Sequence, residues 1–217
     1  MRGREQPPMS DASRRRILER TRRATHGRTP ITLPHPAIAA IPSDLAAFGV
    51  RFLEFATVGG KRHGTLTTGR SLAESVPSLP PGLVMPGRVA VGRSPLARGL
   101  AEAMAIDWSV PGGRADELQA VIIEGRALVG ELGSVLVDPR EVQPASAVFL
   151  AEVQVLVARA DALVPSLSEA LAAAAGLHAP HALLISGPSR TADVEKTLVC
   201  PAHGPRETHL VIVEQGC

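Results

Sequence analysis

The sequence has 217 residues, 45% of them hydrophobic, which is enough for one well-cored domain and short for two. It contains no Tyr, one Trp and four Phe, so aromatic platforms for stacking nucleic acid bases are nearly absent, and a net charge of +2 excludes a strongly basic protein. No run approaches the roughly 20 apolar residues of a membrane helix and no signal-peptide pattern occurs, so we expect a cytoplasmic protein without a membrane span.

Residues 1–28 are predicted to form an arginine-rich amphipathic helix. Ser10 or Asp11 can cap its start, and one stripe of the helix carries the less polar residues Ile17, Leu18, Thr21 and Ala24. Arginines cover the other faces. A docking helix explains this pattern better than an arm that binds nucleic acid, which is the alternative.

A proline-rich stretch, residues 29–42, is predicted to link this helix to the main domain, residues 43–217. The main domain is expected to begin with a helix at 43–48 and a strand at 51–56. The next segment, Gly59 to Gly64, is glycine-rich and basic. Because it lacks the spacing of known phosphate-binding loops, a hairpin or crossover loop is the preferred interpretation.

Short apolar runs then alternate with helical patterns. The expected strands are 88–91, 105–108, 121–123, 135–137, 153–157, 182–185 and 209–214, and the expected helices are 96–104, 115–120 and 165–175. Strand, helix and strand recur at the length of βαβ units. This recurrence predicts an α/β fold with a mostly parallel sheet flanked by helices.

The segment after Ile123 is expected to form a helix of under two turns between Gly125 and Gly130. Glu131 and Gly133 then open the next strand, followed by Ser134. At this position the Glu131 carboxylate can accept N–H bonds at the start of a strand.

Polar and charged residues concentrate in the stretch from Gly187 to Arg206, between two apolar runs that are typical of strands covered on both faces. Two Gly-Pro pairs mark its ends, and turns there can present N–H groups and a guanidinium to an anion. The candidate ligand-binding residues are Gly133, Ser134, Gly187, Pro188, Ser189, Arg190, Thr191, Asp193, Glu195, His203, Gly204 and Arg206.

At these residues the sequence resembles the lactate utilization protein C family, the LUD domain. The resemblance is carried by Gly187-Pro-Ser-Arg-Thr-Ala-Asp-Val-Glu195, by His203-Gly-Pro-Arg206 and by Glu131-x-Gly133, and it extends from about Val121 to Val213. It implies the architecture shared by coenzyme A transferases, ribose-5-phosphate isomerase and glucosamine-6-phosphate deaminase. Because coenzyme A transferases carry their nucleophilic glutamate in a similar Glu-x-Gly setting, the resemblance also makes Glu131 the one carboxylate for which covalent chemistry can be argued, with a purely N–H-accepting role as the alternative. It also implies a subunit of a system that oxidises L-lactate to pyruvate, in which iron–sulfur proteins are the partners.

Two cysteines, Cys200 and Cys217, cannot supply the four thiolates that an iron–sulfur cluster typically takes, and they lack the spacing of a metal site. His178 and His181 flank Pro180, where a metal is possible but solvated loop histidines are the preferred interpretation. We therefore expect no cofactor or metal on this chain and clusters on its partners. A stand-alone enzyme that binds a sugar phosphate or an acyl thioester through Glu131 is the alternative function.

The candidate site is predicted to lie at one edge of the sheet. Ile123 and Ile185 are expected to end parallel strands, and loops that leave parallel strands emerge on the same side. Glu131, Gly133 and Ser134 should therefore meet the loops 187–193 and 203–206 there.

Overall fold

The computed structural model describes residues 10–25, 44–83, 88–107, 117–176, 181–188 and 204–214. The chain divides into two compact units, Met1–Ala39 and Ala40–Cys217. In the first unit, α1 (Asp11–Thr25) lies where the sequence predicts a helix. Ser10 begins it as expected, because its side-chain oxygen accepts the N–H of Ser13 at 3.2 Å.

The second unit begins with a single helix, α2 (Leu45–Phe55), in place of the predicted short helix and strand. Asp44 caps it by accepting the N–H of Ala47 at 2.7 Å. Phe48 and Phe52 lie one helical turn apart, are fully buried, and stack with ring centroids 6.2 Å apart. The predicted strand at 51–56 is therefore wrong, since the apolar spacing that matters here is four residues and not two.

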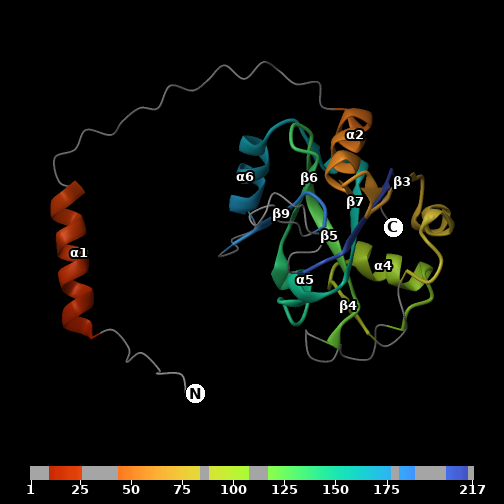
Figure 1. Ribbon diagram of the computed structural model, residues 1–217. Helices are drawn as coiled ribbons and strands as arrows, with labels where there is room; N and C mark the ends of the chain where they lie inside the picture. Colours follow the sequence, from red (N-terminus) through yellow and green to blue (C-terminus); the bar gives the residue numbers. More distant parts are fainter. Residues whose placement is uncertain are drawn as a thin grey trace. The chain divides into compact units, whose positions relative to one another are not determined.

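A mostly parallel sheet forms the centre of this unit, as predicted (Figure 1). Its strand order is β3 (Leu66–Gly69), β10 (Glu207–Val213), β7 (Val153–Arg159), β5 (Ala120–Val129), β6 (Ser134–Val137) and β9 (Leu183–Ile185). Two more strands, β4 (Val89–Val91) and β8 (Leu163–Val164), pair in parallel with the first and second halves of β5. Among the described strands of this sheet, only the pairings of β6, with β5 and with β9, are antiparallel.

The long strand β5 replaces the helix predicted between Gly125 and Gly130. Its register with β6 shifts between Gly125 and Ala127, as at a β-bulge. A Cβ at Gly125 would lie 2.4 Å from Cγ1 of Val135 on the neighbouring strand. This glycine therefore serves strand packing and does not end a strand or begin a helix.

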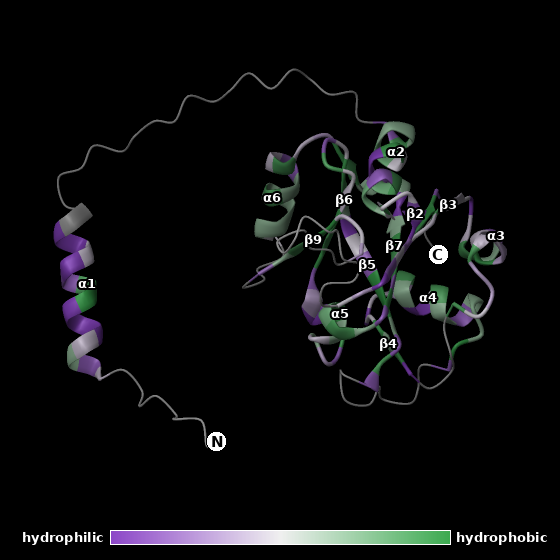
Figure 2. Ribbon diagram, viewed as in Figure 1, coloured by the Kyte–Doolittle hydropathy of each residue, from purple (hydrophilic) through white to green (hydrophobic). Residues whose placement is uncertain are grey.

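Apolar residues alternate between the two faces of the central strands. On one face, Val121, Ile123 and Leu210 share a core with α2 and with α5 (Ala147–Leu150). On the other, Ile122 and Val211 share a core with α3 (Leu72–Ser75) and α4 (Pro95–Ala103). Figure 2 shows these helices with hydrophobic residues toward the sheet. The sheet is thus covered on both faces.

The remaining elements are short. They are the hairpin β1 (Thr57–Val58) and β2 (Lys61–Arg62), the helix α6 (Leu167–Gly176), and the 3₁₀ helices η1 (Val76–Ser78), η3 (Pro139–Glu141) and η4 (Ala160–Ala162). The hairpin confirms the preferred interpretation of the glycine-rich basic loop. The helix α6 lies within two residues of its predicted bounds.

Three local predictions are wrong. Residues 105–107 are not a strand, and Trp108 lies outside the described residues. Residues 117–119 are not part of an α-helix, because Ala120 already begins β5; the start of that predicted helix, 115–116, also lies outside the described residues. The strand β9 is not covered on both faces, since it lies at one end of the sheet and Leu184 is 38% exposed.

Candidate functional site

The described ends of the two Gly-Pro turns line one cleft of about 470 Å³. Gly187 follows β9, and Gly204 and Pro205 precede β10. The other lining residues come from the end of α5, from β7 and from β9: Val148, Phe149, Leu150, Gln154, Leu183, Leu184, Ile185 and Ser186. The sequence predicts that these two loops, which are far apart along the chain, face one ligand. The described ends of both turns line the same cavity.

The walls of this cleft are mainly apolar. Phe149, Leu150 and Leu184 are 48%, 51% and 38% exposed, and none of the described lining residues is charged. Gln154 is almost fully buried, and its amide is held at both ends. Its N–H donates to the carbonyl of Val148 at 2.6 Å, and its oxygen accepts the hydroxyl of Thr208 at 3.2 Å. This wall of the cleft is therefore rigid.

Several predicted site residues cannot be placed. Ser189, Arg190, Thr191, Asp193, Glu195 and His203 lie outside the described residues, as do Cys200 and Cys217. Pro188 is described and buried. Among the described residues, no group of three or more His, Cys, Asp or Glu side chains could hold a metal ion.

Gly133 and Ser134 are structural neighbours of the Gly187 turn. The hydroxyls of Ser134 and Ser186 are 2.7 Å apart. Gly187 and Gly133 both lie against α2, because a Cβ on Gly187 would be 2.9 Å from the carbonyl oxygen of Phe55, and a Cβ on Gly133 would be 2.6 Å from the backbone nitrogen of Phe52. These glycines therefore allow α2 to approach both turns closely.

Glu131 lies in the turn between β5 and β6 and does not line the cleft. Its carboxylate accepts the backbone N–H of Leu167 at 2.6 Å, at the start of α6, and its own N–H donates to the carbonyl of Pro165 at 3.0 Å. These contacts are the ones expected of a capping carboxylate. A covalent role for Glu131 stays a prediction.

We expect Glu131→Gln to fold with nearly the stability of the wild type, because the amide oxygen can still accept the N–H of Leu167. Glu131→Ala should be less stable than Glu131→Gln by about 1 kcal/mol, because that N–H loses its partner. Urea unfolding of the two variants measures the difference. Equal stabilities would show that the carboxylate does not cap α6, and loss of activity in folded Glu131→Gln would argue for a chemical role.

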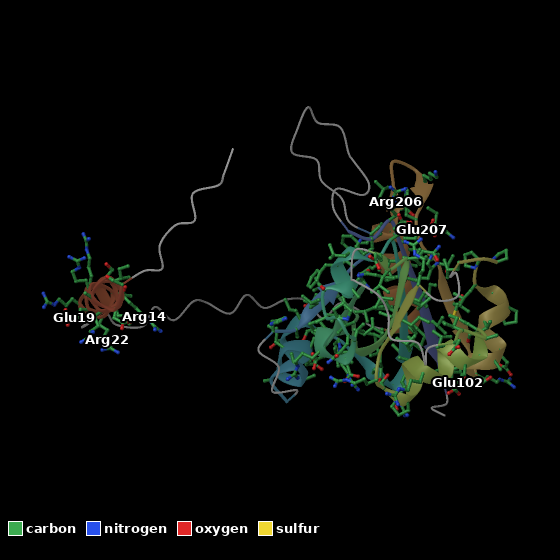
Figure 3. The ribbon with its side chains drawn as sticks, turned by 90° about the horizontal axis from the view of Figure 1, so that it is seen from below. Arg14, Glu19, Arg22, Glu102, Arg206 and Glu207 are labelled. Atoms are coloured by element: carbon green, nitrogen blue, oxygen red, sulfur yellow. The ribbon has the colours of Figure 1, made fainter. Side chains whose placement is uncertain are left out.

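Arg206 lies at the amino end of β10 and not at the carboxyl end of a strand. Its N–H donates to the carbonyl of Glu152 at 2.7 Å, just before β7, and its side chain is exposed (Figure 3). The single site was predicted because loops that leave parallel strands emerge at the same edge of the sheet. That argument is wrong for this loop, since residues 204–206 lead into a parallel strand. Together with the position of Glu131 outside the cleft, this corrects the single-edge prediction: the described parts of the two Gly-Pro turns meet, and Glu131 lies apart from their cleft.

A buried histidine lies on β10 near the same end of the strand. His209 is 2% exposed; its Nδ1 is 2.9 Å from the hydroxyl of Thr65, and its Nε2 is 3.0 Å from the carboxylate of Glu207. Burial lowers the pKa of His209, although the Glu207 carboxylate acts in the opposite direction. A neutral ring can use both contacts, with Nε2–H donating to Glu207.

We expect the stability of the protein to fall as the pH falls below about 6.5. The unfolded chain takes up a proton on His209 at a higher pH than the folded chain does, so protonation favours unfolding through this window. Chemical denaturation between pH 5 and 8 should give a smaller decline for His209→Gln than for the wild type, with the exposed His181→Gln as the control. A wild-type pKa of His209 above the ordinary value, measured by NMR, would contradict the expectation.

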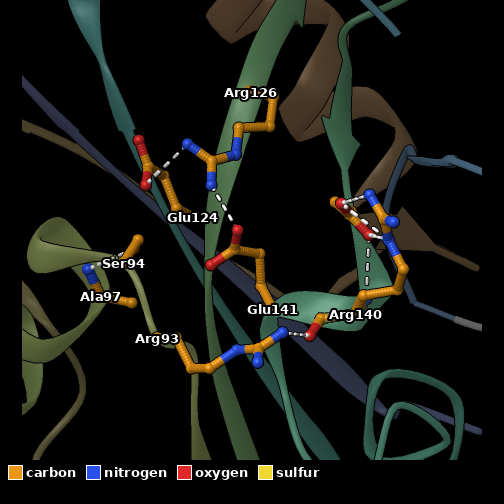
Figure 4. A network of polar contacts seen from close by, with 8 residues as sticks. Arg93, Ser94, Ala97, Glu124, Arg126, Arg140 and Glu141 are labelled. Atoms are coloured by element: carbon orange, nitrogen blue, oxygen red, sulfur yellow. Dashed lines mark hydrogen bonds and ion pairs between the residues drawn. The ribbon is translucent and has the colours of Figure 1, made fainter. Parts of the chain in front are cut away.

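A network of ion pairs between β5 and η3 was not predicted from the sequence (Figure 4). The guanidinium of Arg126 lies 3.3 Å from a carboxylate oxygen of Glu124 and 2.5 Å from one of Glu141. Arg93, which follows β4, donates its backbone N–H to the carbonyl of Glu141 at 2.9 Å. In the same segment, Arg140 donates to Asp138 and lowers the pKa of that carboxyl. Positive and negative groups are matched here, so the network ties the β4–α4 loop to η3.

The fold defines this chain as an α/β protein with a mostly parallel sheet flanked by helices. It is similar to the crystal structure of a DUF162 family protein from Deinococcus radiodurans, with 21% sequence identity and a TM-score of 0.53 over 78% of this chain and 95% of that chain. At this identity the likeness supports the fold. The family model of the LUD domain matches residues 114–213, which confirms the resemblance to the LUD domain over that range. No curated protein matches the chain.

Proposed function

We propose that this protein is a subunit of a system that oxidises L-lactate to pyruvate together with iron–sulfur partner proteins. The observation that carries the proposal is the LUD domain match over residues 114–213, because that range includes both Gly-Pro motifs and the Glu131 turn. The LUD domain is associated with lactate utilization. The cleft between the two Gly-Pro turns is the part of the chain to which we assign the role.

The electron balance requires an acceptor, because L-lactate gives up two electrons and two protons when it becomes pyruvate. The two cysteines of this sequence are fewer than the four thiolates that a cluster takes. In the proposed system the iron–sulfur clusters that accept the electrons are therefore bound by partner chains.

The chemistry of the cleft supports contact with a partner chain. A lactate carboxylate can be bound by backbone N–H groups or by a charged side chain, and the described lining residues include no charged side chain. Exposed Phe149 and Leu150 are instead typical of a contact surface between proteins, where aromatic anchors contribute much of the affinity. Arg206 is exposed and directly follows Pro205, which lines the cleft. Its guanidinium is the described charged group that we assign to binding an anion beside the cleft.

Copurification from lactate-grown cells tests the proposal. We expect a tagged wild-type protein to retain iron–sulfur proteins whose cluster absorbance bleaches when L-lactate is added. Phe149→Asp should lose them, whereas Val50→Asp, which places the same charge at a 60% exposed position on α2, should retain them. Recovery of no cluster-containing protein with the wild type, or equal recovery with Phe149→Asp, would count against the proposal as stated.

A further inference from the structure

The helix α1 carries a strong local charge. It has six arginines, Arg14, Arg15, Arg16, Arg20, Arg22 and Arg23, against two acids, Asp11 and Glu19. In Figure 3, which looks along the helix, Arg14, Arg22 and Glu19 point to successive sides. Neither the fold of the second unit nor the proposed function uses this charge, so α1 calls for an explanation of its own.

One face of α1 is less polar than the rest. Ile17 and Leu18 are its large apolar side chains and are 55% and 46% exposed. Thr21 lies one turn after Ile17 and donates its hydroxyl to the Ile17 carbonyl at 2.9 Å, which satisfies that hydroxyl within the helix. At about 100° per residue, Arg14 lies on this face as well, between Ile17 and Leu18. Arg16 and Arg20 lie on one side of the face, and Arg15 and Arg22 lie on the other. Figure 2 shows the helix as mainly hydrophilic with a narrow hydrophobic band.

We propose that α1 binds the surface of an anionic lipid bilayer. A cluster of four to eight basic residues on an amphipathic helix is typical of segments that bind acidic headgroups, and α1 carries six. A helix that lies in the interface places its apolar side chains at the acyl boundary, while flanking arginines reach up to the phosphates. The described part of the chain contains no helix long and apolar enough to cross a membrane, so the contact is with the surface.

Charge together with an apolar face distinguishes a lipid surface from a nucleic acid. Phosphates on DNA or RNA attract the arginines equally well, but that binding gives no role to Ile17 and Leu18. A bilayer uses both groups at once. Removing either one should therefore weaken binding to vesicles, whereas only the loss of charge should weaken binding to nucleic acid.

The test is cosedimentation of the full-length protein with vesicles of phosphatidylcholine containing about 30% phosphatidylglycerol, compared with pure phosphatidylcholine. We expect binding to the anionic vesicles at low salt. The variant Arg15→Gln/Arg22→Gln/Arg23→Gln should bind about 100-fold more weakly, at about fivefold per arginine. Ile17→Ser/Leu18→Ser, which leaves the charge unchanged, should bind about tenfold more weakly. The control Lys61→Gln/Arg62→Gln/Arg70→Gln removes the same charge from the second unit and should change binding by less than about threefold.

Three outcomes would overturn the proposal. Equal binding of the wild type and Ile17→Ser/Leu18→Ser would mean that charge alone attracts the protein. Binding to a DNA duplex without binding to vesicles would identify nucleic acid as the occupant. Salt-sensitive self-association in light scattering, again without vesicle binding, would identify a second copy of the chain.

Discussion

Gly133→Ala should lower the free energy of unfolding by at least about 3 kcal/mol, which is a fall of roughly 10 °C in Tm for a chain of this size. Gly133 has a φ of +60°, a conformation that a side chain disfavours. The added Cβ would also lie 2.5 Å from Cβ of Arg51 and 2.6 Å from the backbone nitrogen of Phe52. These are positions in the middle of α2, so the helix would have to move.

Gly82→Ala is the matched control for this prediction. Gly82 has a φ of +72°, but a Cβ there would meet nothing within 4 Å, so the substitution adds the same backbone strain without the contact. It should cost about 1 kcal/mol. The difference between the two variants in urea unfolding measures the close packing of α2 on the β5–β6 turn. Equal losses would show that Gly133 is required for its backbone conformation alone.

Gly64→Ala should also destabilise the protein by about 3 kcal/mol or more. A Cβ at Gly64 would lie 2.0 Å from the carbonyl oxygen of Thr208 on β10 and 3.2 Å from Cβ of Ala56. The chain is fixed at this place, because the N–H of Thr208 donates to the carbonyl of His63 at 3.0 Å. The substitution should therefore push the β3 side of the sheet away from β10.

The control for Gly64 is Gly176→Ala, at the end of α6. A Cβ there meets nothing within 4 Å, and the change should alter stability by less than about 1 kcal/mol. Thermal unfolding of both variants compares them directly. If Gly64→Ala were as stable as Gly176→Ala, β10 and the segment before β3 would not be as closely packed as the structure has them.

The central strands could be predicted because they are buried on both faces. Apart from the exposed end residues Arg159 and Glu207, the polar positions in β7 and β10 are Gln154, Thr208 and His209. Those three residues could have predicted side-chain hydrogen bonds inside the core, since a buried amide, hydroxyl or imidazole must find a partner. Their hydrogen bonds hold the wall of the cleft and the start of β10.

The errors came from features that depend on tertiary packing. Gly125 looks like the boundary of a helix, but it is required by the side chain of Val135 across a strand pair. In the same way, the apolar run of β9 has the composition of a central strand, and only the pairing of the sheet shows that it lies at an end. Local sequence does not contain that information.

The candidate site, too, could be predicted only in part. That two Gly-Pro turns meet could be anticipated from their residue types, whereas Phe149 and Leu150 of the short helix α5 carried no recognisable motif. Arg206 was correctly placed before the last strand, but its loop was expected at the edge where parallel strands end, whereas it leads into β10 at the amino end of that strand. Glu131 was singled out as a candidate nucleophile, with acceptance of N–H bonds as the alternative, and its carboxylate accepts the N–H of Leu167.

The most direct test of the central claim is the rate at which cell extracts transfer electrons from L-lactate to a dye, in a strain that lacks this gene. We predict that the rate falls to background, that the wild-type gene restores it, and that Phe149→Asp restores it far less than Val50→Asp does. Equal rates of lactate oxidation with and without the gene would contradict the proposed function.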